Sequence, residues 1–89
     1  MNKYDLYIKS SIYKKSKKLS NKDKVRLKAI DSKIKEICKN PYAFKPLKKP
    51  LQNKRGVHIG PFVIVYEIDE KKKTVIISNY KHHDDIYKI

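Results

Sequence analysis

Residues 62–80 read FVIVYEIDEKKKTVIISNY, and this stretch decides the fold. It contains two runs of aromatic and β-branched residues, 62–68 and 74–80, and such runs favour strands. The polar residues 69–72 between them predict a hairpin loop. The two runs are therefore predicted to pair as antiparallel strands.

A third strand is predicted immediately before this hairpin. Residues 56–60 place the apolar Val57 and Ile59 at alternate positions, a period of two that is typical of a strand with one buried face. Gly60-Pro61 predicts a turn or bulge that leads into residues 62–68. The C-terminal half therefore reads as a three-strand antiparallel meander.

Two helices joined by a tight turn are predicted over residues 11–39. The first begins near Ile12, with a serine cap before it, and runs to about Leu19. Ser20 and Asp23 have the spacing of a capping box, which marks the start of the second. Apolar residues then recur at spacings of three and four, which is one helical stripe: Leu27, Ile30, Ile34 and Ile37. Asn40-Pro41 is expected to end this helix.

Near the N-terminus, Tyr4, Leu6 and Ile8 alternate with polar neighbours and predict a short strand with one buried face. A loop rich in proline and lysine, residues 40–53, connects the helices to the meander. The order strand-helix-helix-strand-strand-strand predicts an α+β fold. We expect one domain over residues 1–89, in which an antiparallel sheet carries a helical hairpin on one face.

Length and charge limit the function. The chain has 89 residues, too few for a dinucleotide-binding domain or a barrel. It has 23 Lys and Arg residues against 9 Asp and Glu residues, a formal net charge of +14. Such a charge favours a polyanionic partner: nucleic acid first, an acidic protein second, an anionic membrane third.

A single cysteine, Cys38, excludes an internal disulfide and a cysteine-based zinc site. The N-terminus lacks the apolar stretch of a signal peptide, and no apolar run approaches the length of a membrane span. We therefore expect a soluble, cytoplasmic protein that needs no cofactor.

The histidines are the candidate chemical groups: His58 on a predicted strand, and His82 and His83 just past the end of another. If those two strands are neighbours, the imidazoles can converge. Histidine transfers protons near neutral pH, which suits acid–base cleavage of RNA. The alternative is that each is structural or merely exposed.

Such cleavage also needs cations on the phosphate, and five residues could supply them: Lys45, Lys48, Lys49, Lys54 and Arg55. Two lysine-rich runs, 14–18 and 71–73, have a simpler interpretation as solvated surfaces. Residues 82–85, HHDD, also suggest a metal site, but adjacent strand residues point to opposite faces, so a solvated segment is favoured and no metal is expected.

Three segments resemble the RelE/ParE superfamily of toxins from toxin–antitoxin modules, and its YafQ-like branch above all. Residues 45–48, KPLK, are similar to the H-P-L-K-G stretch of that branch. Residues 55–66, RGVHIGPFVIVY, are similar to its R-D-x-H-V-x-P-D-W-x-L-I-Y strand pair. Residues 83–87, HDDIY, are similar to its closing H-x-x-L-F and to the H-R-x-D-I-Y ending of RelE-type members.

The resemblance implies a metal-independent endoribonuclease that cuts messenger RNA, either on the ribosome or free, and so inhibits translation. His58 and His83 would be its acid–base pair, and Tyr87 the terminal aromatic that stacks on or orients a nucleotide. Lys45 stands where the branch has a histidine and would stabilise charge. The RNA contacts would come from Lys48, Lys49, Lys54, Arg55 and His82. Whether His82 or His83 faces the site depends on the strand register.

The resemblance also implies partners and an alternative. An acidic antitoxin protein would cover the basic surface and block the site, and the ribosomal A site would present the messenger RNA. At two positions Phe62 and Val63 replace the branch's aspartate and tryptophan, and Val63 replaces the arginine of the RelE type. Val63 and Lys45 favour the alternative, and the paired histidines oppose it. The alternative is a ParE-like toxin that acts on DNA gyrase without cutting RNA, or a degenerate member that only binds RNA or its antitoxin.

Overall fold

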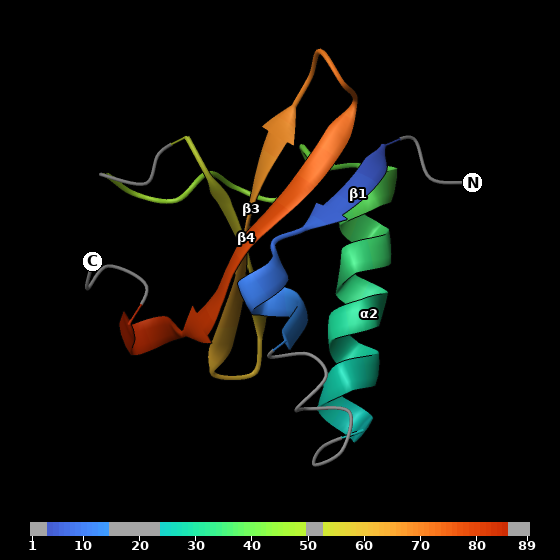
Figure 1. Ribbon diagram of the computed structural model, residues 1–89. Coiled ribbons are helices and arrows are strands. Elements are labelled where there is room, and N and C mark those ends of the chain that lie inside the picture. Colours follow the sequence, from blue (N-terminus) through green and yellow to red (C-terminus); the bar gives the residue numbers. More distant parts are fainter. Residues whose placement is uncertain (1–3, 15–23, 50–52, 86–89) are drawn as a thin grey trace.

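The structure, a computed structural model, describes residues 4–14, 24–49 and 53–85. Its elements follow the predicted order (Figure 1). They are β1 (Asp5–Ile8), a helical segment at residues 10–14, α2 (Lys24–Lys39), β2 (Arg55–Ile59), β3 (Phe62–Asp69), β4 (Thr74–His82) and the 3-10 turn η1 (His83–Asp85). In the part of the chain described, no helix combines the length and apolar character needed to cross a membrane.

The four strands form one sheet in the order β1-β4-β3-β2. β3 pairs antiparallel with both β2 and β4, which confirms the predicted meander. β1, in contrast, runs parallel to β4, so the expectation of an entirely antiparallel sheet is wrong in this detail. Short turns impose antiparallel pairing only on consecutive strands, and β1 reaches β4 from the far end of the chain.

α2 and residues 10–14 cover one face of the sheet, which we call the inner face (Figure 1). Ile30 and Ile37 of α2 are buried there and Ile34 packs against the same core, so the predicted helical stripe is confirmed. α2 ends at Lys39, directly before Asn40-Pro41, as expected. The predicted helix cap at Ser20 and Asp23 lies outside the described residues.

The predicted buried face of β1 forms only in part. Ile8 and Tyr4 pack against the core, but Leu6 between them is 43% exposed. β1 is an edge strand with β4 as its one neighbour in the sheet, so Leu6 has packing partners on one side only. A period of two predicts the direction of a side chain but not how completely it is covered.

β4 is two residues longer than predicted, and it contains an irregularity. Val65 pairs with Asn79 and Tyr66 with Ile77, so Ser78 is an extra residue in β4. Its buried hydroxyl donates to the Val65 carbonyl at 3.2 Å. Such a bulge shifts the alternation of the strand by one residue.

Candidate active site on the outer face of the sheet

The face of the sheet opposite α2, here the outer face, presents one row of functional side chains. His58 of β2 pairs with Val63 of β3, and Val63 pairs with Lys81 of β4. Paired residues point to the same side of a sheet. Neighbouring strands lie ~4.8 Å apart, so the Cα atoms of His58 and Lys81 are about 10 Å apart across Val63. His58 is exposed and Val63 is buried.

A loop fixes further lysines beside this row. Leu47 packs on the outer face against Val63 and Val65. Its backbone N–H donates to the Lys54 carbonyl at 2.9 Å, and its neighbour Pro46 forms a β-bridge with Arg55. These contacts fix the loop at Leu47, and the exposed Lys48 and Lys49 follow directly. Lys45, just before the bridge, is also exposed.

His82 does not join His58. The two strands are not neighbours, because β3 lies between them. His82 pairs with Phe62 in the row of the sheet next to the row of His58, Val63 and Lys81. Because successive residues of a strand point to opposite faces, His82 points to the inner face. Its ring meets that of Phe62 edge-on with centroids 5.6 Å apart, and its Nδ1 accepts the backbone N–H of Asp84 at 3.2 Å.

Phe62, which replaces the branch's aspartate, is the centre of a small aromatic cluster on the inner face. Its ring stacks on Tyr80 with centroids 5.1 Å apart and planes inclined by 15°. The guanidinium carbon of Arg26, from α2, lies 4.6 Å from the Phe62 ring centre. The cluster packs the end of the sheet against α2.

The other half of the predicted catalytic pair is described only by its backbone. His83 begins η1 directly after β4. Nothing further is described of its side chain, and Tyr87 lies outside the described residues. The roles of His83 and Tyr87 stay predictions.

The side chains of Arg55 and Lys54 contact other groups and do not join the outer-face row. Arg55 donates to the Phe44 carbonyl oxygen, and its guanidinium carbon lies 5.1 Å from the centre of the Tyr42 ring. Lys54 is ion-paired with Glu67. The register pairs Arg55 with the buried Tyr66, whose side chain belongs to the inner-face core, so Arg55 also starts from that side.

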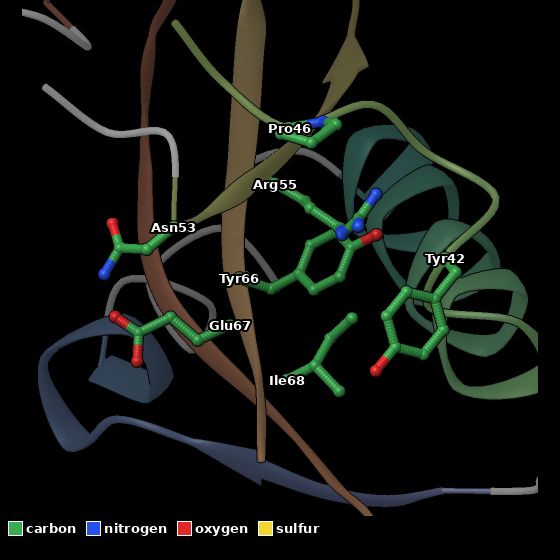
Figure 2. A pocket seen from close by; sticks show the side chains of 7 residues that line it. All are labelled: Tyr42, Pro46, Asn53, Arg55, Tyr66, Glu67 and Ile68. Atoms are coloured by element: carbon green, nitrogen blue, oxygen red, sulfur yellow. The ribbon is translucent and has the colours of Figure 1, made fainter. Parts of the chain in front are cut away.

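These side chains line a pocket of about 280 Å³ where β2 stops pairing with β3, here the edge pocket (Figure 2). It is lined by Tyr42, Pro46, Asn53, Arg55, Tyr66, Glu67 and Ile68. Burial raises the pKa of the Tyr66 hydroxyl to about 12, so it stays protonated, and it donates to the Pro41 carbonyl oxygen at 2.6 Å.

Sequence reasoning missed Lys81. Without a bulge, alternation from the buried Ile77 would put residues 79 and 81 on the inner face. The extra residue Ser78 reverses this, so that Tyr80 is buried in the core and Lys81 falls in the outer-face row. A bulge leaves no clear mark in a run of β-branched residues, so this sequence carries no signal for it.

Residues 8–87 match the family model of the ParE toxin of the type II toxin–antitoxin system parDE. A Methanocaldococcus jannaschii protein called "Putative toxin RelE4" is 46% identical over 86 residues, covering 96% of this chain and 92% of that protein.

Two solved structures share the fold. The toxin–antitoxin complex RelBE2 from Mycobacterium tuberculosis contains a chain with a TM-score of 0.75 and 23% identity, over 96% of this chain and 97% of that one. A double arginine-to-alanine mutant of the Escherichia coli toxin RelE, in the free state, gives a TM-score of 0.73 at 18% identity, over 97% and 88% of the two chains.

Proposed function

Because the chain belongs to the ParE toxin family within the RelE/ParE superfamily, and is thus a toxin of a type II toxin–antitoxin system, we propose that it acts by cutting messenger RNA. The observation that carries this proposal is the outer-face row: an exposed histidine, His58, in register with Lys81. A proton acceptor and a cation whose Cα atoms lie about 10 Å apart can flank one phosphate, because the lysine side chain spans much of that gap.

The proposed reaction needs no metal. His58 takes the proton of a ribose 2′-hydroxyl, whose oxygen attacks the adjacent phosphorus. The new O2′–P bond replaces the P–O5′ bond, which yields a 2′,3′-cyclic phosphate and a 5′-hydroxyl. His83 gives a proton to the leaving 5′-oxygen.

The remaining roles are electrostatic and orienting. Lys81 and the lysines of the loop, Lys45, Lys48 and Lys49, stabilise the negative charge that grows on the phosphoryl oxygens. Tyr87 orients a neighbouring nucleotide by stacking. Lys54, which is held in its ion pair with Glu67, contributes to the wider positive field that attracts RNA.

The test is to express the chain from a tightly controlled promoter and map messenger-RNA 5′ ends. His58→Ala is expected to lower cleavage by ~10²-fold or more, the usual contribution of a general base. His82→Gln is the matched control, because its imidazole lies on the inner face. If His58→Ala and His82→Gln cut RNA equally well, the assignment of His58 is wrong.

Two partners belong to this proposal. The first is an acidic antitoxin protein, supported by the net charge of +14 and by the toxin–antitoxin complex among the structural neighbours. Co-purification with the product of an adjacent reading frame tests it. The second is the ribosomal A site with its messenger RNA. Cuts in phase with the reading frame would support the ribosome, whereas cuts unrelated to codons would exclude it.

A second candidate is a ParE-like toxin that acts on DNA gyrase without cutting RNA. It is favoured by the family model that matches and by the uncharged Val63 at the centre of the row. Growth arrest without new 5′ ends, persisting after all three histidines are replaced, would support this toxin or a member that only binds over the nuclease.

A further inference from the structure

The edge pocket has no role in the proposed cleavage, yet it has the size and chemistry of a ligand site. The β2–β3 ladder ends at the Arg55–Tyr66 pair, while β3 continues to Asp69. The cavity left beside β3 measures about 280 Å³. Small-molecule sites begin near ~300 Å³, so it has room for one planar ring system and little more.

The two ends of the pocket differ in hydrogen-bonding character. Figure 2 shows Asn53 and Glu67 on one side of Tyr66, and Arg55 on the other side, toward Tyr42. A guanidinium has five N–H donors, and the bond to the Phe44 carbonyl accounts for one of its nitrogens. The Glu67 carboxylate has two acceptor oxygens, and Lys54 pairs with Oε1.

Apolar and aromatic surface lies between those ends. Ile68 and Pro46 line the cavity, whereas Tyr66 beneath them is fully buried. Tyr42 forms one wall, with 51% of the residue exposed. A flat ring entering the pocket would gain apolar contact on its faces and polar partners along its edges.

We propose that the edge pocket binds a guanine base of the RNA, an inference that rests on the proposed function for its substrate. Guanine carries two acceptors, O6 and N7, on one edge, and these suit the Arg55 guanidinium. Its N1–H and N2 amino donors lie on the neighbouring edge, and these suit Glu67 and Asn53. Adenine, cytosine and uracil each lack part of this pattern.

The pocket lies within reach of the outer-face row. Arg55 and His58 are three residues apart on β2, which corresponds to about 10 Å along the strand. β2 is an edge strand of the sheet. A single RNA strand that crosses this edge can place a phosphate beside His58 and a nearby base in the pocket.

The first test measures binding without cleavage. The full chain is titrated with guanosine, adenosine, cytidine and uridine 5′-monophosphates, while the ring signals of its tyrosines are followed by NMR. Guanosine monophosphate is expected to bind at least about fivefold more tightly than the others, the usual value of a good bidentate contact. Glu67→Gln and the exposed Asn53→Ala should each reduce that preference. Glu36→Gln is the matched control, because Glu36 forms a similar lysine pair on α2.

Equal affinities for the four nucleotides, or a guanine preference unchanged in both pocket variants, would overturn the inference. The pocket would then suit a peptide of the antitoxin better than a base. A failure of the nuclease proposal would give another result: the chain would bind guanosine monophosphate selectively but would cut no RNA. Conversely, the cuts could depend on His58 but show no guanine nearby and no change in Glu67→Gln. The nuclease proposal would then stand, and the guanine-binding proposal for the pocket would be wrong.

Discussion

At the residue scale, Gly56 allows the closest packing on the outer face. A Cβ atom at this position would lie 2.8 Å from Leu47 Cδ2 and 3.1 Å from Val63 Cγ1. Leu47 can approach β2 this closely only because Gly56 has no side chain. The packing of the Leu47 side chain on the outer face therefore depends on a glycine that takes no part in a turn.

Gly56→Ala is expected to crowd Leu47 and to lower the free energy of unfolding by ~1–2 kcal/mol, within the usual range for overpacking. Thermal denaturation measures the loss, and Leu47→Ala in the same chain should recover part of it. Gly60→Ala is the control: Gly60 has a φ of 57° and no atom within 4 Å of its Cβ position, so its cost is backbone strain that Leu47→Ala cannot relieve. A similar recovery in both glycine variants would contradict the crowding.

Residue-level prediction from the sequence succeeded where alternation was regular. His58 follows Val57 and precedes Ile59 in an unbroken pattern, so its exposure on a strand could be foreseen. Lys81 could not be foreseen, because the bulge at Ser78 reverses the alternation before it. The position of Arg55 depends on contacts with Tyr42 and Phe44, which are distant in sequence.

At the element scale, one exposed carboxylate ties three segments together. Glu70, in the β3–β4 turn, accepts hydrogen bonds from the hydroxyls of Tyr4, before β1, and of Tyr42, after α2. Lys73 of the same turn pairs with it. The hydrogen bonds from Lys73 and then Tyr42 lower the pKa of Glu70 to about 2.

This lowered pKa predicts a pH dependence of stability. The carboxylate is easier to ionise in the folded chain than in the unfolded chain, where its pKa is near 4.5. The stability that it contributes is therefore present above about pH 4.5 and is lost as the pH falls toward 2. Denaturation of the wild type and Glu70→Gln at pH 5 and at pH 2.5 should show a difference at pH 5 that shrinks at pH 2.5.

Asp31→Asn is the control for this experiment, since it removes an exposed carboxylate that pairs with Lys35 on α2 alone. It should change stability little at either pH, as is usual for surface ion pairs. A difference between wild type and Glu70→Gln that stays constant from pH 5 to 2.5 would show that the Glu70 carboxylate does not stabilise this junction.

The pairing of strands that a short turn connects could be predicted, and the pairing of strands that lie far apart in the sequence could not. The β3–β4 hairpin follows from two β-branched runs and a polar turn, all within about twenty residues. The parallel pairing of β1 with β4 depends on how α2 and residues 10–14 cross the sheet, and strand propensity carries no information about it.

At the scale of the whole molecule, several acidic residues of the sheet lie toward its hairpin end. Asp5 and Asp69 flank Thr74 in one row, and Glu67 lies in the next row. Four of the nine acidic residues therefore gather at the hairpin end, counting Glu70 in the turn, where they offset the three lysines at 71–73. His58 and Lys81 lie at the opposite end. The net charge predicts a polyanion as partner, and the arrangement of the acidic residues favours its binding toward the end that carries His58.

The salt dependence of RNA binding should therefore come more from Lys48 and Lys49 than from the lysines of the β3–β4 turn. Replacing Lys48 and Lys49 with glutamine is expected to reduce the slope of log K against log salt by about 1.4, at ~0.7 per lost phosphate contact for a single strand. Replacing Lys71 and Lys72 removes the same charge from the acidic end and should leave the slope unchanged. Fluorescence binding of a short RNA by His58→Ala chains measures both, and equal losses would indicate a diffuse field without a preferred end.

The parallel pairing of β1 with β4 also determines when a newly made chain can complete its sheet. Asp5 pairs with Thr74, 69 residues further on. β1, the first strand synthesised, therefore has no partner strand until β4, the last, has been made. Until then β3 has only β2 beside it, and the apolar inner face lacks half of its sheet. β4 also supplies Lys81 and leads into His83. In the proposed mechanism the chain would therefore gain its activity only when its sheet is complete, and an unfinished chain would expose apolar surface that favours aggregation.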